Sequence, residues 1–116
     1  MHLLLAAILS VEGWRGPGTT GAAGEVGPYQ ITYGYWKDSK VPGAHRDCER
    51  KEYAELVMER YWKRHCPGAW LEGDLETLAA VHHWGPKGVR LAKSKAYKDS
   101  YVTRVLGLIG RGGTWQ

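Results

Sequence analysis

Glu12 is the residue whose position most directly suggests chemistry. It is the first charged residue of the chain and follows a mostly apolar run, MHLLLAAILSV. Because burial disfavours the ionised form of a carboxyl group, we expect a raised pKa for Glu12. A carboxylic acid that stays protonated near neutral pH can protonate a leaving oxygen, as glycoside hydrolysis requires. The alternative is a structural ion pair with Arg15, since such pairs also perturb carboxyl groups.

Two adjacent histidines, His82 and His83, precede Trp84 at a predicted helix end. Neighbouring helical residues point about 100° apart, so the pair is poorly placed to bind one metal ion. We therefore predict neither a metal nor another cofactor. His82 lies on the apolar face of its helix, where a histidine is more often a hydrogen-bonded core residue. The alternative role for His82 is to position Glu12 or a substrate sugar.

Mostly helical elements must position these residues. Apolar periodicity and helix-end signals predict helices over residues 2–12, 47–65, 75–84 and 94–109. Asp47 and Asp74 are the expected N-caps of the second and third helices. Gly13, Pro67-Gly68 and Gly85-Pro86 are expected to end the first three.

The segments between these helices are predicted to be irregular. Residues 13–27 are rich in glycine and form a loop or short hairpin, and residues 37–46 form a loop. Residues 28–36 form either a short strand or a turn that runs into a helix. The tail, residues 110–116, is expected to be frayed. At 116 residues the chain is predicted to be a single domain, mainly α with a small irregular or β region near residues 14–35.

Composition narrows the class of partner. The net charge of +4 attracts the chain to anionic polymers, but no long basic run and no nucleic-acid motif is present, so we expect no nucleic-acid partner. Six Trp and seven Tyr with no Phe suit wet surfaces and sugar stacking. No Ser or Cys nucleophile motif and no phosphate-binding loop is recognisable.

The two cysteines, Cys48 and Cys66, bracket the predicted helix over residues 47–65. Eighteen residues of helix separate them by roughly 27 Å, whereas a disulfide needs Cα atoms within about 7 Å. We therefore predict that they do not pair.

The apolar N-terminal run lacks a preceding basic residue and a following A-x-A site, and it is too short to span a bilayer. We expect no signal peptide and no membrane insertion.

Three segments together resemble a known family. These are Glu12-Gly13, then Gly27-Pro28-Tyr29-Gln30-Ile31 followed by Tyr35-Trp36, then the segment from Val81 to Gly88, VHHWGPKG. In order and spacing they resemble the invertebrate-type (destabilase-like) lysozymes and small bacterial and phage proteins of that superfamily. They resemble the soluble lytic transglycosylases more loosely. The match runs from about residue 6 to 103, and GPYQI followed by YW is its most specific part.

The resemblance implies an α-rich lysozyme-like fold with a substrate cleft. It implies cleavage of the β-1,4 bond between N-acetylmuramic acid and N-acetylglucosamine in peptidoglycan. The implied protein is a bacteriolytic monomer that acts on the cell wall in the periplasm, outside the cell or after delivery by a phage. Glu12 matches the catalytic acid. The residues expected to bind substrate are Gly27, Tyr29, Gln30, Tyr35, His82, His83 and Trp84, and Gly85 is expected to let backbone approach the sugar.

Several positions depart from the family pattern. Gly13, His83 and Trp84 replace a serine, an asparagine and a small residue. The usual second carboxylate is missing, and Glu25 is its candidate replacement, while we interpret Asp38 as structural. A second carboxyl about 5 Å from the acid allows retaining hydrolysis, and about 6.5 to 9.5 Å allows inversion. If neither the Glu25 nor the Asp38 carboxyl lies within these distances of Glu12, Glu12 acts alone and gives a 1,6-anhydro sugar, as in a lytic transglycosylase.

Two further functions stay open. The departures fit a non-catalytic module that binds cell-wall glycan without cleaving it. Some relatives of the invertebrate type are credited with isopeptidase activity, which would need a nucleophile beside a base. Ser39 follows Asp38, but no Lys or His is predicted near it.

Overall fold

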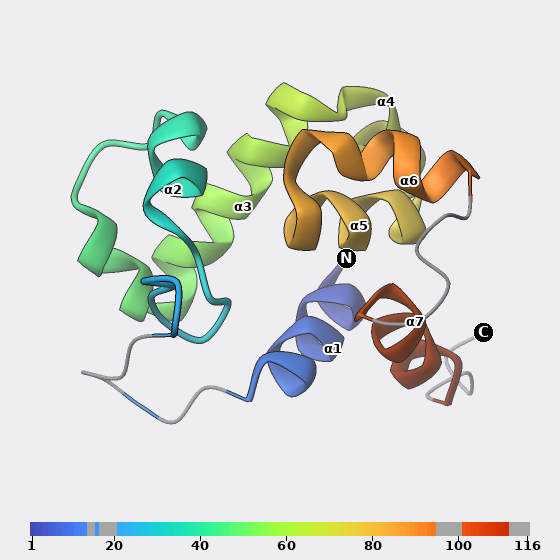
Figure 1. The fold of residues 1–116 in the computed structure, drawn as a ribbon, viewed down its shortest axis with the longest axis horizontal. Coiled ribbons are helices and arrows are strands. Elements are labelled where there is room, and N and C mark those ends of the chain that lie inside the picture. Colours follow the sequence, from blue (N-terminus) through green and yellow to red (C-terminus); the bar gives the residue numbers. More distant parts are fainter. Residues whose placement is uncertain (14–15, 17–20, 95–100, 112–116) are drawn as a thin grey trace.

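The computed structural model describes residues 1–13, 16, 21–94 and 101–111, and it is mainly α-helical, as predicted (Figure 1). Within these residues the only extended pairing is an isolated antiparallel bridge between Val26 and Ile31. The elements in chain order are α1 (His2–Glu12), α2 (Tyr33–Ser39), η1 (His45–Glu49), α3 (Lys51–His65), α4 (Pro67–Glu72), α5 (Leu75–Trp84), η2 (Gly85–Lys87), α6 (Gly88–Ser94) and α7 (Tyr101–Arg111), where η marks a 3-10 helix.

Helix α1 packs against α7 and the end of α5, which brings both ends of the described chain together (Figure 1). Leu4, Ala7 and Ile8 are buried because they recur at helical spacing on one side of α1. The helix ends at Glu12, where Gly13 adopts the left-handed conformation and its N–H bonds back to Leu9, as predicted. This end leaves the Glu12 side chain at the margin of the core.

Helix α3 crosses the molecule between α2 on one side and α4 and α5 on the other (Figure 1). Its buried residues include Val57 and Tyr61 of the predicted face. The predicted start at Asp47 is wrong, because residues 45–49 form the separate 3-10 helix η1. The Asp47 carboxylate accepts from the Ala44 N–H at 2.8 Å instead of capping α3.

Helix α5 begins and ends where the sequence predicts. The Asp74 carboxylate accepts from the Thr77 N–H at 3.2 Å, and Gly85 ends the helix with a φ of 80°. Its interior is apolar except for His82, which is buried on the same side as Leu78 and Ala79. The helix therefore carries a histidine into the core at its C-terminal end.

Several further elements depart from the predicted map. Pro67 ends α3 but also begins α4, and α6 follows directly after η2. Helix α2 occupies the end of the predicted segment 28–36 and the first part of the predicted loop 37–46. Helix α7, described from Tyr101 to Arg111, covers most of the predicted helix over residues 94–109, but Ser94 belongs to α6. Residues 95–100 and the tail 112–116 lie outside the described residues.

The buried faces of these helices form one connected core. Cys48 and Cys66 lie in it as free thiols, as predicted, and burial raises their pKa values to about 12 and about 11. Such thiols are protonated and unreactive at neutral pH.

In the described part of the chain, no helix combines the length and apolar character needed to cross a bilayer.

Candidate active site

A cleft of about 340 Å³ opens where the end of α1, the turn before α2 and the end of α5 meet. Its volume falls within the range of small-ligand sites. All predicted site residues line it except Gly27 and Tyr29. The lining residues are Glu12, Glu25, Gln30, Thr32, Tyr35, Tyr61, His82, His83, Trp84 and Gly85.

The Glu12 carboxyl is largely removed from solvent, since its side chain is 17% exposed. Burial raises the pKa of Glu12, and the negative charge of Glu25 acts in the same direction. The Tyr101 hydroxyl and the positive charge of Arg104 lower the pKa of Glu12, but their effects do not outweigh burial. Glu12 is therefore a carboxyl group whose environment favours its protonated form.

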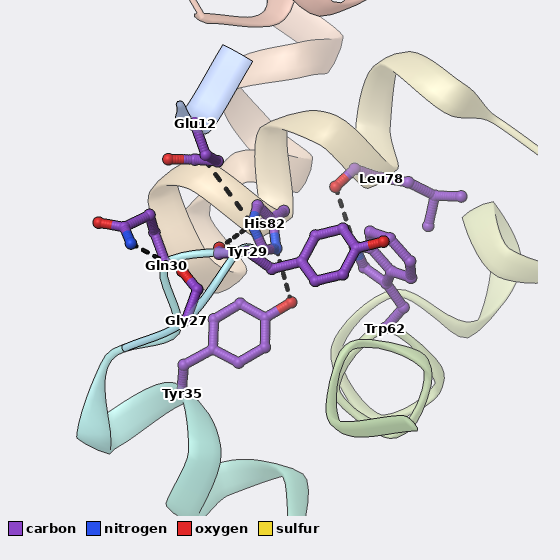
Figure 2. Close-up of polar contacts among 8 residues, drawn as sticks. All are labelled: Glu12, Gly27, Tyr29, Gln30, Tyr35, Trp62, Leu78 and His82. Atoms are coloured by element: carbon purple, nitrogen blue, oxygen red, sulfur yellow. Dashed lines mark hydrogen bonds and ion pairs between the residues drawn. The ribbon is translucent and has the colours of Figure 1, made fainter. Parts of the chain in front are cut away.

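His82 is buried at the centre of a hydrogen-bond network that joins α5, the turn at Tyr29 and α2 (Figure 2). Its Nε2 lies 3.0 Å from the Tyr29 carbonyl oxygen, and its Nδ1 lies 2.9 Å from the Tyr35 hydroxyl. A carbonyl oxygen only accepts, so Nε2 carries the proton and Nδ1 accepts from Tyr35. His82 thus ties α5 to the turn at Tyr29 and to α2.

The same imidazole faces the catalytic candidate. Nε2 of His82 lies 4.0 Å from a carboxyl oxygen of Glu12, too far for a hydrogen bond (Figure 2). Burial lowers the pKa of His82 to about 4, so the ring is neutral at pH 7. His82 is therefore a hydrogen-bonded core histidine, and no hydrogen bond from it positions Glu12. Its role toward a substrate sugar stays a prediction.

Tyr101 at the start of α7 is a site residue that the sequence interpretation missed. Its hydroxyl is buried and has no well-formed hydrogen bond within the described residues, yet its interaction with Glu12 lowers the pKa of the carboxyl. The Tyr101 ring stacks on His83 with centroids 4.1 Å apart and planes 7° apart. Only the packing of α1 against α7 brings Tyr101 to Glu12, so no local signal marks it.

Glu25 shares the cleft with Glu12 and is the second acid that lines it. One of its carboxylate oxygens accepts from the Ala23 N–H at 2.9 Å, which holds the side chain against its own loop. Its charge is close enough to raise the pKa of Glu12. The two carboxyl groups thus reach the cleft from different elements, since Glu12 ends α1 and Glu25 lies in the loop before the Val26–Ile31 bridge.

Gln30 lines the cleft at the end of a tight turn. Its backbone N–H bonds to the Gly27 carbonyl at 3.0 Å, and its side-chain amide donates to the same oxygen at 2.7 Å (Figure 2). Its φ of 55° is in the left-handed region, which is uncommon outside glycine. The Val26–Ile31 bridge closes this turn and presents Gln30 to the cleft.

Tyr29 and Gly27 have other roles from those the resemblance implies. The Tyr29 side chain is fully buried, and its hydroxyl donates to Glu55 at 2.6 Å, so only its carbonyl serves the site, through His82. A Cβ on Gly27 would lie 1.9 Å from the Cys48 carbonyl oxygen. Gly27 is therefore required by the packing of the turn on η1, not by the approach of a sugar.

Aromatic rings form the remaining walls. His83 meets Trp84 edge to face with centroids 4.9 Å apart, and Tyr35 stacks on Tyr61 at 3.7 Å. Burial and the charge of Arg104 lower the pKa of His83, which favours its neutral form. Tyr61 and Thr32 were not predicted as site residues. Thr32 caps α2 by accepting from the Tyr35 N–H, a signal readable as an N-cap but not as a cleft position.

The other candidates lie away from the cleft lining. Asp38 accepts from His65 Nε2 at 2.9 Å, in keeping with a structural role. Ser39 is buried and donates to the Trp36 carbonyl at 2.6 Å, which argues against Ser39 as a nucleophile. Arg15, the alternative partner of Glu12, lies outside the described residues.

The described residues contain no group of three or more His, Cys, Asp or Glu that is placed to bind a metal ion.

In comparisons with known proteins, no family model matches the chain and no curated sequence matches it.

Proposed function

We propose that this protein has a lysozyme-like domain that cleaves the glycan strands of peptidoglycan, with Glu12 as general acid. The bond is the β-1,4 linkage between N-acetylmuramic acid and N-acetylglucosamine. The observation that supports this proposal is the partly buried Glu12 carboxyl, whose pKa is raised within a cleft that a second carboxylate also lines. Most glycoside hydrolases use a carboxyl group with a raised pKa as the acid, together with a second carboxylate in the same cleft.

In the proposed first step the Glu12 proton moves to the glycosidic oxygen as the bond from that oxygen to the sugar carbon breaks. The electron pair of the bond stays on the leaving oxygen, and Glu12 becomes a carboxylate. Neutral His82 at 4.0 Å adds no positive charge that would ionise Glu12 before the reaction. Trp84 lines the cleft and is partly exposed, so its indole is the aromatic ring best placed to stack on a sugar.

For the second step we favour Glu25 as the second carboxylate. It is the second acid that lines the same cleft as Glu12. A water molecule then completes hydrolysis and leaves a reducing N-acetylmuramic acid end. In the retaining pathway Glu25 bonds to the anomeric carbon as the leaving oxygen departs, and the water then displaces Glu25 and gives its proton to the ionised Glu12. In the inverting pathway Glu25 takes the proton of the water that attacks the anomeric carbon.

One observation favours a lytic transglycosylase as the alternative. The Glu25 carboxylate accepts a hydrogen bond from Ala23 in its own loop, and this bond restricts the movement of the Glu25 side chain into the cleft. If Glu25 does not take part, the Glu12 carboxylate accepts the proton of the sugar 6-hydroxyl, whose oxygen then closes on the anomeric carbon. The product is a 1,6-anhydro sugar, and no water is consumed.

Mass spectrometry of the fragments released from purified peptidoglycan tests these proposals. Reducing N-acetylmuramic acid ends support hydrolysis, and 1,6-anhydro ends, lighter by one water, support the transglycosylase. Release of stem peptides without glycan cleavage would instead support the isopeptidase. Binding to peptidoglycan without any cleaved product would identify the glycan-binding module and contradict both enzymatic proposals.

A further inference from the structure

An aromatic patch lies on the surface of α2 and the start of α3, outside the cleft. It consists of Tyr33, Trp36, His45 and Tyr53, flanked by Lys37 and Arg50. Tyr33 and Tyr35 are two positions apart in α2 and therefore point about 200° apart around the helix. Because Tyr35 is buried toward His82, Tyr33 faces away from the cleft, and the patch is a separate surface.

Contacts within the patch hold its rings in place. The Tyr33 ring centroid lies 5.5 Å from that of Trp36 and 5.8 Å from that of His45. The Trp36 indole donates to the Tyr53 hydroxyl at 2.9 Å, and that hydroxyl donates to the Pro42 carbonyl at 2.9 Å. Hydrogen bonds thus fix Trp36 and Tyr53 before any ligand arrives, which reduces the entropy lost on binding.

Tyr33 differs from its neighbours in its exposure to solvent. Trp36, His45 and Tyr53 are half-buried and join α2, η1 and α3, whereas Tyr33 is 56% exposed. The Lys37 ammonium lies 5.8 Å from the Tyr33 ring centroid, and the Arg50 guanidinium carbon lies 5.3 Å from that of Tyr53. The patch therefore combines an exposed ring with flanking cations, one of which, Arg50, also lies 3.8 Å from Asp47.

We propose that this patch is a second glycan-binding surface, which holds a cell-wall strand whose sugars carry carboxylate groups. Sugar faces would stack on Tyr33, and Lys37 would pair with a carboxylate of the lactyl or peptide substituent. The choice of a peptidoglycan strand as occupant rests on the proposed function. Single-stranded nucleic acid also offers rings and negative charge, but its proteins use longer tracks of positive charge than two flanking cations.

Retention on purified insoluble peptidoglycan tests the proposal, with binding measured by co-sedimentation over a range of salt concentrations. Every variant carries Glu12→Gln, so the measurement does not depend on turnover. We expect Tyr33→Ala to bind about fivefold more weakly, the factor for loss of roughly one aromatic contact. Tyr33→Phe keeps the ring and should restore binding. Lys37→Gln should weaken binding at low salt and reduce its dependence on salt.

Lys63→Gln is the matched control. Lys63 also lies over an aromatic ring, 5.5 Å from the Trp70 centroid, and its loss changes the net charge by the same amount. It should leave retention unchanged, as should Leu71→Ala at an exposed apolar residue of α4. Circular dichroism spectra verify that each variant is folded.

Equal retention of Tyr33→Ala and its parent would overturn the proposal, as would equal weakening by Lys63→Gln and Lys37→Gln. A single-stranded oligothymidylate is tested in parallel. If Tyr33→Ala lost binding to this DNA and kept its wall retention, the surface would be a nucleic-acid site and the proposal would be wrong. Failure of the wild-type protein to cleave peptidoglycan would count against the proposed function and not against this retention result.

Discussion

The Glu12 carboxyl and the His82 imidazole face each other across 4.0 Å, and the histidine is neutral. A protonated imidazole at that distance would stabilise the carboxylate and lower the pKa of Glu12. Instead His82 commits Nε2–H to the Tyr29 carbonyl and accepts from Tyr35 through Nδ1. The buried network thus keeps a positive charge away from the carboxyl whose proton the proposed reaction needs.

Acid should destabilise the fold through His82. Its pKa is about 4 in the folded protein and near 6.5 when unfolded, so the unfolded chain binds more protons between these values. The His82 contribution is complete above pH 6.5, and it declines by roughly 3 kcal/mol as pH falls to about 4. Glu12, whose pKa is raised, opposes this trend because protonation favours its folded environment. Urea unfolding at pH 7, 5.5 and 4 measures the change.

His82→Gln isolates the histidine contribution, because the amide donates and accepts but does not titrate in this range. We expect a lower free energy of unfolding at pH 7, since the network loses its native geometry. Between pH 6.5 and 4 the variant should lose less stability than the wild-type protein. An equal acid-induced loss in both proteins would be inconsistent with a neutral buried His82.

Removal of the Tyr101 hydroxyl should shift the pH dependence of activity. That hydroxyl lowers the pKa of Glu12, so in Tyr101→Phe the pKa should rise and the alkaline limb of the pH–rate profile should move to higher pH. Stability should change by less than about 1 kcal/mol, because the buried hydroxyl has no well-formed hydrogen bond to lose among the described residues. A limb that moves to lower pH would refute this assignment.

Glu25→Gln should act in the opposite direction on the same limb. The Glu25 charge raises the pKa of Glu12, so its removal should move the alkaline limb to lower pH. If Glu25 is the second carboxylate, the maximal rate should also fall by about 100-fold. Glu72→Gln removes an equal charge outside the cleft and should change neither quantity. A full maximal rate in Glu25→Gln would exclude its catalytic role and favour the transglycosylase.

Gly27→Ala should destabilise the turn that presents Gln30. Gly24 has the same φ of 82° but nothing within 4 Å of an added Cβ, so Gly24→Ala reports the backbone strain alone. Gly27→Ala adds the clash with the Cys48 carbonyl, and we expect it to cost about 2 kcal/mol more than the control. Thermal unfolding of the pair measures the difference. Equal losses would mean that η1 moves aside without cost.

Features with local causes were predictable from the sequence. Gly13, Asp74 and Gly85 mark helix ends through backbone conformation and capping, and all three lie where predicted. The short helices α4 and α6 were missed because six or seven residues carry too little apolar periodicity. The prediction of Asp47 as a helix N-cap was wrong because its carboxylate accepts from the Ala44 N–H instead. Any aspartate before a helix can form such a local hydrogen bond, so the sequence does not distinguish the two.

The site residues that could be predicted from the sequence are those whose own side chains can take part in acid–base chemistry or hydrogen bonding. Glu12, His82 and their neighbours on α5 line one cleft, as the order of the segments indicated. Tyr29 was misassigned because nothing in the string GPYQI tells which side chains of a tight turn face inward. Tyr101 was missed because its contact with Glu12 joins the two ends of the described chain, and only tertiary packing creates it.

The most direct test of the proposed function is the rate at which wild type and Glu12→Gln clear a suspension of purified peptidoglycan. The amide of the variant cannot donate the proton that the Glu12 carboxyl supplies, so we expect a loss of about 1,000-fold or more at the optimal pH. The variant should be at least as stable as wild type at pH 7, because it removes a buried group that resists ionisation. Equal clearing rates in two folded proteins would contradict the assignment of Glu12 as the acid.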